Sequence, residues 1–239
     1  MAIDPERHSR VVAMLREEKL DALICSAPTQ VFLLTGYWPV IGNSIAIFTV
    51  DGEVRVLLPE DEHEIAAHSS NAVLTDFRPE QLRILTTPKQ AVEKPLTHLC
   101  RKLSITQTRV GMELEQNLQP ASYAVTACYR STLRDLLQEE FPKLTIVGAD
   151  NQLEKLKASK TAVELERMQA GANAAEAGFN AAPDAIQEGL READIAAANQ
   201  SAFERSPMVA RMQRSYGFFT ACLAPTPPPP LHMRALVKG

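Results

Sequence analysis

The sequence lacks the motifs with which proteins most often hold nucleotides or structural metals. Neither G-x-G-x-x-G nor G-x-x-x-x-G-K-[ST] occurs, so the backbone cradle for phosphate in dinucleotide and P-loop sites is missing. No C-x-x-C pair occurs among the four cysteines, Cys25, Cys100, Cys128 and Cys222. We therefore expect no zinc ribbon, redox motif or disulfide, and we interpret the cysteines as buried free thiols.

A strong excess of charge is also missing. The 25 Lys and Arg and 29 Asp and Glu residues give a formal net charge of −4 over 239 residues. This balance offers no basic surface for nucleic acid or for an anionic membrane. The N-terminus, MAIDPERHSR, has no apolar core after its basic residues, so it is not a secretory signal, and we expect a cytoplasmic protein.

A membrane span is not expected either. The stretch from Ala22 to Val50 carries no charge, but Pro28, Gly36 and Pro39 interrupt it. Because β-branched and aromatic residues cluster between these breaks, the stretch is typical of buried strands joined by turns.

Short apolar runs alternate with helical patterns through the first 150 or so residues, which predicts an α/β fold. Asp4 followed by Pro5 predicts the start of the first helix, and Asp51-Gly52 predicts a β-hairpin, so the sheet should be mixed. The expected helices cover residues 5–20, 60–68, 89–103 with Pro95 inside, and 120–140. The expected strands cover residues 21–26, 30–36, 44–50, 53–59, 72–77, 83–87, 109–113 and 143–149.

The pattern changes after Asp150. Thr161 and Glu164 form a T-x-x-E capping box, which predicts a helix of about five turns. Gly171 and Gly178 lower its helix propensity, so we expect both to permit close packing against a neighbour. A second helix is expected near Glu192, then a strand at SYGFFTACLA, and four consecutive prolines end regular structure.

Three segments resemble the creatinase and prolidase family, which includes the Xaa-Pro aminopeptidases. REEKLDALICSAPTQVFLLTGY is similar to the opening of its N-terminal domain. LEKLKASKTAVELERMQAGANAAEAG is similar to the segment that opens its catalytic domain, and IQEGLREADIAAA to a later part of that domain. The order and spacing of the three segments fit the family from Asp4 to about Cys222.

The resemblance implies an N-terminal α/β domain at residues 1–152 and, at residues 153–239, the truncated start of an α+β "pita-bread" catalytic domain. In the family that domain holds two divalent metals, Mn, Co or Zn, with two Asp, one His and two Glu. All five ligands are expected downstream of Cys222. From Arg205 to Gly239 the sequence contains no Asp and no Glu, so no such site can be completed there.

The resemblance offers three candidates for residues near a substrate. Tyr37 and Trp38 follow the family's LTG motif, in a loop that in relatives can reach a neighbouring subunit's active site, although a packing role is also open. His232 can be compared with a substrate-contacting histidine of some relatives. Among other groups, the acidic run Glu60, Asp61, Glu62 and Glu64 is interpreted as solvated, and His63 and His68 are spaced wrongly for a helical metal site.

We therefore expect a member of this hydrolase family, a metallopeptidase that cleaves Xaa-Pro or related C–N bonds, whose chain as given is inactive alone. The alternative is a non-catalytic binding or oligomerisation module of the same fold. A homo-oligomer, most simply a dimer, is expected because the helices after Leu153 would lack their covering strands. The end of the sequence, Pro225 to Gly239, is expected to be extended, as either a reading-frame change or a natural tail would be.

Overall fold

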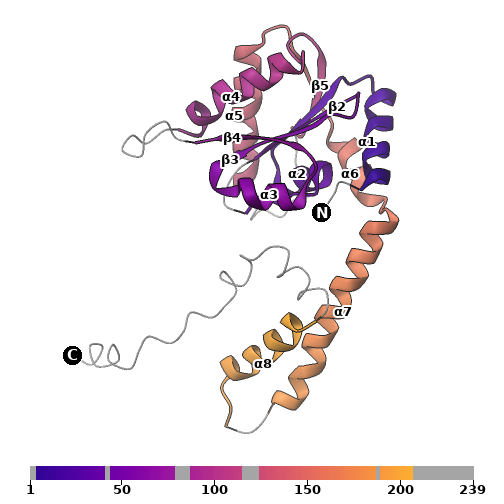
Figure 1. The fold of residues 1–239 in the computed structure, drawn as a ribbon, viewed down its shortest axis with the longest axis vertical. Coiled ribbons are helices and arrows are strands. Elements are labelled where there is room, and N and C mark those ends of the chain that lie inside the picture. Colours follow the sequence, from indigo (N-terminus) through magenta and orange to yellow (C-terminus); the bar gives the residue numbers. More distant parts are fainter. Residues whose placement is uncertain (1–3, 41–43, 79–86, 115–123, 187–188, 207–239) are drawn as a thin grey trace, which may run out of the picture. The chain divides into compact units, whose positions relative to one another are not determined.

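The computed structural model describes residues 4–40, 44–78, 87–114, 124–186 and 189–206. The chain divides into two compact units, Met1–Leu165 and Glu166–Gly239, and each is described by itself. The first contains an α/β sheet structure and the second a pair of helices (Figure 1). The first unit thus confirms the α/β prediction.

Six described strands form one sheet in the order β4-β3-β2-β1-β5-β6. Strand β2 is antiparallel to both of its neighbours, whereas every other neighbouring pair is parallel. The sheet is therefore mixed, and the β2–β3 hairpin turns at Asp51-Gly52, where Gly52 has φ 87°. The strands are β1 (Ala22–Cys25), β2 (Ile45–Thr49), β3 (Val54–Pro59), β4 (Val73–Phe77), β5 (Arg109–Met112) and β6 (Thr145–Gly148).

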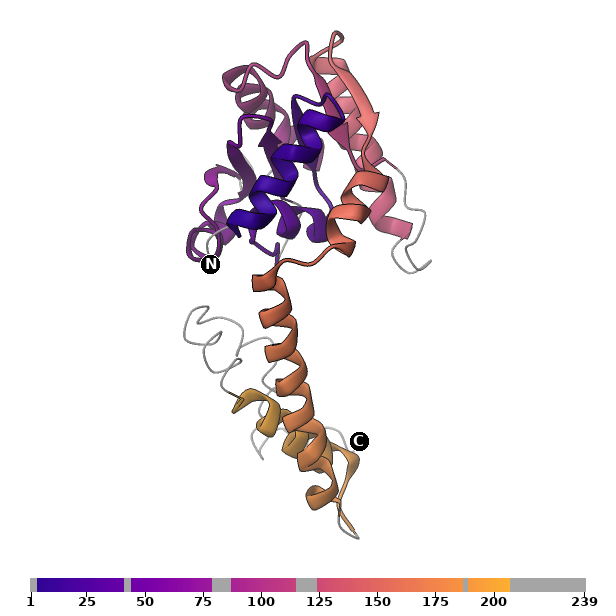
Figure 2. The same ribbon diagram turned by 90° about the vertical axis from the view of Figure 1, so that its right-hand side faces the viewer.

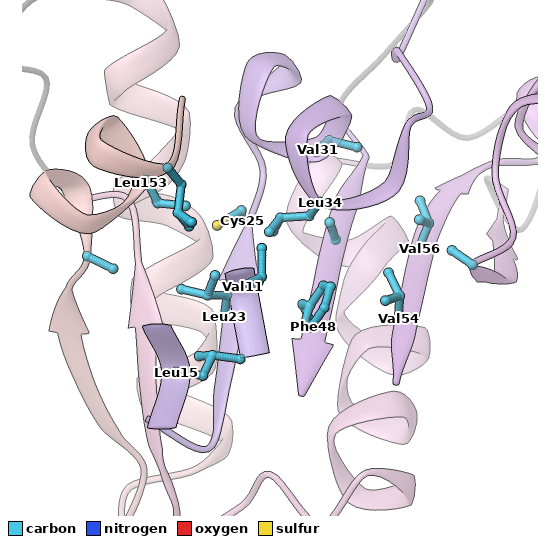
Figure 3. Packing of buried hydrophobic residues seen from close by; sticks show 14 of the residues in the cluster. Val11, Leu15, Leu23, Cys25, Val31, Leu34, Phe48, Val54, Val56 and Leu153 are labelled. Atoms are coloured by element: carbon cyan, nitrogen blue, oxygen red, sulfur yellow. The ribbon is translucent and has the colours of Figure 1, made fainter. Parts of the chain in front are cut away.

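Both faces of the sheet are covered, and each face has its own apolar core. On one face, side chains of β1, β2 and β3 pack with Val11 of α1 (Pro5–Glu17), Leu34 of α2 (Pro28–Thr35) and Leu153 of α6 (Asp150–Ala158), as Figure 3 shows. On the other face, the alternate strand residues pack with α4 (Pro88–Lys102) and α5 (Ala124–Glu140). This alternation explains why the strand sequences are apolar almost throughout.

The local start signals act as the sequence predicts. The Asp4 carboxylate accepts the backbone N–H of Glu6 at 3.0 Å and so caps α1. A short 3-10 helix, η1 (Glu60–Glu62), leads into α3 (His63–Ser69), where a helix was expected. The long helix α4 contains Pro95 in its interior, also as expected.

The prediction of a strand at residues 30–36 was wrong, because this segment forms α2. Pro28 occupies the first turn of the helix, and Gly36, with φ 75°, ends it in the left-handed conformation. The segment is apolar on most sides, and a short apolar run carries no period that separates a strand from a buried helix. The first helix was also predicted too long, since α1 ends at Glu17 rather than at Leu20.

The second unit contains most of α7 (Ala162–Ala185) and all of α8 (Glu192–Glu204), as expected (Figure 2). A Cβ atom placed on Gly178 would lie 2.8 Å from Asn199 Oδ1 of α8, so this glycine does permit close packing. Among the described residues, nothing lies within 4 Å of such an atom on Gly171, so the close packing expected there is not found in this part of the chain. Met168, Phe179 and Ile186 are exposed on this unit.

Cys25 and Cys100 are buried thiols, as predicted. The side chains of Cys128 and Cys222 lie outside the described residues, as do nearly all of the expected strand at residues 83–87, the strand SYGFFTACLA and the segment Pro225 to Gly239. Within the part of the chain that the structure describes, no helix is both long enough and apolar enough to cross a membrane.

Candidate functional site

Five of the six strands run in the same direction, so their carboxyl ends share one edge of the sheet, which we call the carboxyl edge. In open α/β sheets this edge is where ligands usually bind. Three segments follow strands there: α2 and the loop to β2 after β1, the η1 turn after β3, and Glu113 after β5. The loop after α2 contains the sequence-predicted candidates Tyr37 and Trp38.

Tyr37 and Glu62 form a buried pair at the carboxyl edge. Both residues are fully buried, and the Tyr37 hydroxyl donates a hydrogen bond to Glu62 Oε2. The backbone N–H of Val40 donates to the same oxygen at 2.7 Å. Burial, together with the hydrogen bond to Glu62, raises the pKa of Tyr37 well above its usual value, so the phenol stays protonated and keeps its donor role.

The position of Glu62 corrects one expectation. The acidic run from Glu60 to Glu64 was interpreted as solvated, yet Glu62 points inward and is fully buried, whereas Asp61 and Glu64 are exposed. The run looks like surface because four acids in five positions suggest a solvated helix start. The buried partner of Glu62 is Tyr37, which lies 25 positions earlier in the sequence. The pattern of neighbouring residues cannot indicate such a distant partner.

Trp38, on the loop held by the Tyr37–Glu62 hydrogen bond, forms an exposed aromatic pair with Phe32. Trp38 is 48% exposed and Phe32, on α2, is 40% exposed. Their ring centroids lie 6.0 Å apart at an interplanar angle of 69°, an edge-to-face arrangement. Val40, two positions after Trp38, is also exposed, and we call Phe32, Trp38 and Val40 together the aromatic patch. The candidates therefore separate: Tyr37 supports the loop from within, and Trp38 is available at the surface.

Glu113 is a second buried carboxylate at the carboxyl edge, and sequence reasoning did not single it out. Its Oε1 atom accepts the backbone N–H groups of Ser26 and Ala27 at 2.5 Å and 2.8 Å, directly before α2. A carboxylate here satisfies amides left free at the helix start. The available signal was an acid placed immediately after the strand sequence RVGM. Glu113 therefore fixes the start of α2, as Glu62 fixes the loop beyond its end.

The described residues do not bring together a metal site. No group of three or more His, Cys, Asp or Glu side chains able to hold an ion occurs among them. His63 lies 2.6 Å from Asp76 through Nδ1, whereas His68 Nδ1 contacts the carbonyl of Glu64. His232, the third candidate for a residue near the substrate, lies outside the described residues. In the described residues, the carboxyl edge offers exposed apolar side chains beside a segment held by hydrogen bonds to the buried Glu62.

Comparisons with known proteins agree on one family. Residues 7–159 match the creatinase/prolidase N-terminal domain. The fold matches a prolidase from Pyrococcus furiosus at 20% identity and TM-score 0.56, covering 82% of this chain and 52% of the prolidase. It matches the X-Pro aminopeptidase from Thermotoga maritima MSB8 at 16% identity and TM-score 0.64, covering 87% and 50%.

A third match is the Xaa-Pro dipeptidase from Bacillus anthracis, at 14% identity and TM-score 0.55, covering 83% of this chain and 48% of the dipeptidase. At these identities the likeness concerns the fold. This chain therefore spans about half the length of these solved structures. No curated protein matches it by sequence comparison.

Proposed function

Because this chain belongs to the creatinase/prolidase N-terminal domain family, we propose that residues 1–152 are such a domain and that residues 153–239 open the catalytic domain of a hydrolase. The proposed reaction of the completed protein is metal-dependent hydrolysis of Xaa-Pro or related C–N bonds. The observation that carries this proposal is the fold shared with the P. furiosus prolidase and the T. maritima X-Pro aminopeptidase over 82% and 87% of this chain.

The residues of this chain do not fit the two divalent ions, Mn, Co or Zn, that the family resemblance implies. A dinuclear centre needs several carboxylates around two ions. The described residues hold no group of three suitable side chains, and no Asp or Glu occurs from Arg205 to Gly239. We therefore derive no catalytic step, and the proposal is that the chain as given does not catalyse the reaction by itself.

The proposed role of the carboxyl edge is contact with substrate or with a neighbouring subunit through Trp38. Two observations support it: the indole is half exposed, and the loop that carries it is fixed by the buried Tyr37–Glu62 pair. A rigid aromatic side chain binds with little loss of conformational entropy. In the same proposal the protein works as a cytoplasmic homo-oligomer, most simply a dimer.

The first experiment assays the purified chain with Xaa-Pro dipeptides in the presence of Mn²⁺, Co²⁺ or Zn²⁺. We expect no hydrolysis above the uncatalysed rate and fewer than two tightly held metal ions per chain by elemental analysis. Turnover that depends on added metal would contradict the proposed inactivity. Reading the DNA beyond codon 222 in all three frames tests whether ligand-bearing strands are encoded there.

A second experiment tests whether the first compact unit, residues 1–165, serves as such an N-terminal domain. A chimera joins residues 1–165 of this chain to the catalytic domain of the T. maritima X-Pro aminopeptidase, in place of that enzyme's own N-terminal domain. We expect a folded chimera that hydrolyses an Xaa-Pro peptide and a Trp38→Ala variant with raised KM. A folded chimera with no activity, beside an active parent enzyme, would argue against the assignment.

The aromatic patch also favours a second candidate function, that of a non-catalytic binding or oligomerisation module. Exposed aromatic side chains on a rigid support are typical of interface hot spots. If the chain is such a module, we expect an inactive chimera. We also expect the chain to associate with itself and the Trp38→Ala variant to associate more weakly. Light scattering on the two purified proteins measures this difference.

A further inference from the structure

Arg7 is a buried cation at the junction between α6 and α7. The residue is only 2% exposed, although arginine is almost never fully buried without partners. Burial removes the guanidinium from water, so its N–H groups must find acceptors inside the protein. The positions of those acceptors decide what the side chain does.

The acceptors come from both sides of the junction. Arg7 Nε and Nη2 donate to the two carboxylate oxygens of Glu164 at 2.9 Å and 2.5 Å, a bidentate pair. Nη2 also donates to the carbonyl of Ser159 at 2.9 Å, and Nη1 donates to the carbonyl of Leu156. These carbonyls lie at the end of α6, where helix carbonyls lack partners of their own. One side chain therefore binds the end of α6 and the first turn of α7.

A second contact fastens α7 to the start of α1. Asp4 caps α1 with one oxygen and accepts the hydroxyl of Thr161 with the other. Thr161 also forms the capping box of α7: its Oγ1 atom accepts the Glu164 N–H at 3.2 Å, and its own N–H donates to Glu164 Oε2 at 3.0 Å. Thr161 and Glu164 thus form the start of α7 and also bind side chains at the start of α1.

A third side chain of α1 reaches the turn between the two helices. Arg10 Nη1 donates to both the carbonyl and the hydroxyl of Ser159, each at 2.9 Å. Residues from the first two turns of α1 therefore contact the end of α6, the turn and the first turn of α7.

We propose that Arg7 is a positioning residue that docks the α6–α7 junction, residues 156–164, onto α1 and makes a fixed joint of it. In this arrangement the starting point of α7 depends on α1, which lies about 150 positions earlier in the chain. The joint belongs to the first unit alone. The proposal about Arg7 does not depend on whether the completed protein is a hydrolase.

The test is native-state cleavage of the whole chain by a protease that cuts only after lysine. Lys157 and Lys160 are the sites inside the joint, and replacing an arginine leaves them unchanged. Arg7→Met is compared with Arg16→Met, a matched change of an exposed arginine on the same helix. We expect cleavage after Lys160 to become about tenfold faster or more in Arg7→Met, because several hydrogen bonds to a charged group are lost, and to stay unchanged in Arg16→Met.

Amide hydrogen exchange shows whether Arg7 stabilises the joint alone or the whole first unit. In Arg7→Met we expect faster exchange at residues 159–165 and unchanged exchange in strands β1 and β2. Arg7→Lys should give an intermediate rate, since an ammonium keeps the charge but not the bidentate geometry. Exchanging the two charges, Arg7→Glu with Glu164→Arg, should not restore protection, because the carbonyl of Leu156 would lose the donor that Arg7 supplies and the carbonyl of Ser159 would keep only Arg10.

Two results would overturn the proposal. One is a folded Arg7→Met protein whose cleavage and exchange at the joint match the wild type. The other is exchange that rises equally in the joint and throughout the sheet, which would make Arg7 a general stabilising residue. If Arg7→Met does not fold, Glu164→Gln replaces it: a smaller rise confined to the joint supports the proposal, and no rise contradicts it.

Discussion

Tyr37 donates a hydrogen bond to Glu62 across two segments that follow different strands of the sheet. The loop before β2 and the turn after β3 are thereby joined, and the N–H of Val40 is bound by the same carboxylate oxygen. Because Trp38 lies between the two bound positions, its surface placement depends on a carboxylate that is itself buried.

Glu62→Gln should destabilise the first unit and move Trp38. The amide is a weaker acceptor than the carboxylate, so we expect a loss of about 1–3 kcal/mol in the free energy of unfolding. Urea unfolding followed by tryptophan fluorescence measures it, since Trp38 is the single tryptophan of the chain. The matched control is Glu64→Gln, at an exposed position of the same acidic run, and equal effects of the two changes would contradict the role given to Glu62.

Glu164 should make the stability depend on pH in the acid range. Burial raises the pKa of its carboxyl, but hydrogen bonds from the Arg7 side chain and the Thr161 backbone outweigh this, and the pKa is lowered overall. A pKa below the unfolded value of about 4.3 means that the stabilisation is complete above that pH and is lost as the pH falls through the folded value.

Thermal unfolding between pH 2 and pH 7 measures this contribution. Glu164→Gln should lower the melting temperature at neutral pH and lose part of the acid dependence below about pH 4. Glu166→Gln, an exposed neighbour on α7, serves as the control and should retain the wild-type profile. Parallel curves for wild type and Glu164→Gln would show that Glu164 does not cause the dependence.

The two glycines of α7 should respond to alanine in opposite directions. Gly171→Ala adds helix propensity in open space, so we expect about 0.5–1 kcal/mol of stabilisation. Gly178→Ala places a methyl group 2.8 Å from Asn199 Oδ1 and 3.4 Å from the Asn199 carbonyl, so overpacking should outweigh the gain. Helix content followed by circular dichroism on heating compares the two, and a more stable Gly178→Ala protein would contradict the packing of α7 on α8.

Exposed apolar residues of the second unit should drive association at micromolar concentration. Phe179 is 72% exposed, and Met168 and Ile186 are exposed as well. We expect Phe179→Ser to shift the protein toward the monomer in light scattering. Phe32→Ser is the comparison on the first unit: if it alone weakens association, the aromatic patch is the contact surface, and a wild-type monomer would contradict both.

The sequence predicted well the features that depend on near neighbours. Asp4 and Pro5, the Asp51-Gly52 hairpin and the Thr161–Glu164 capping box each involve residues at most a few positions apart, and their geometry follows from backbone chemistry. The mixed sheet followed from that hairpin within an otherwise alternating pattern.

The features that were missed depend on distant partners. Glu62 is buried with Tyr37 as its hydrogen-bond partner. Arg7 is buried with Glu164 as its partner, and the two residues are 157 positions apart in the sequence. The identity of α2 as a helix rests on packing around it rather than on its own period. Trp38 was singled out by resemblance, but its partner Phe32 was not, because α2 was taken for a strand. Whether Tyr37, Trp38 and His232 lie near a substrate stays a prediction.

The order of strands in the sheet has a consequence for synthesis on the ribosome. Strands β1 to β4 can pair as soon as residue 77 has emerged, whereas the other edge of β1 waits for its partner, since Ala22 pairs with Val110. During that interval the nascent chain presents ALIC, a fully apolar strand, with an open hydrogen-bonding edge. Slowed translation after residue 77 has emerged and before residue 112 has emerged should therefore increase the chain's dependence on chaperones and its aggregation, more than a pause after residue 112 has emerged would.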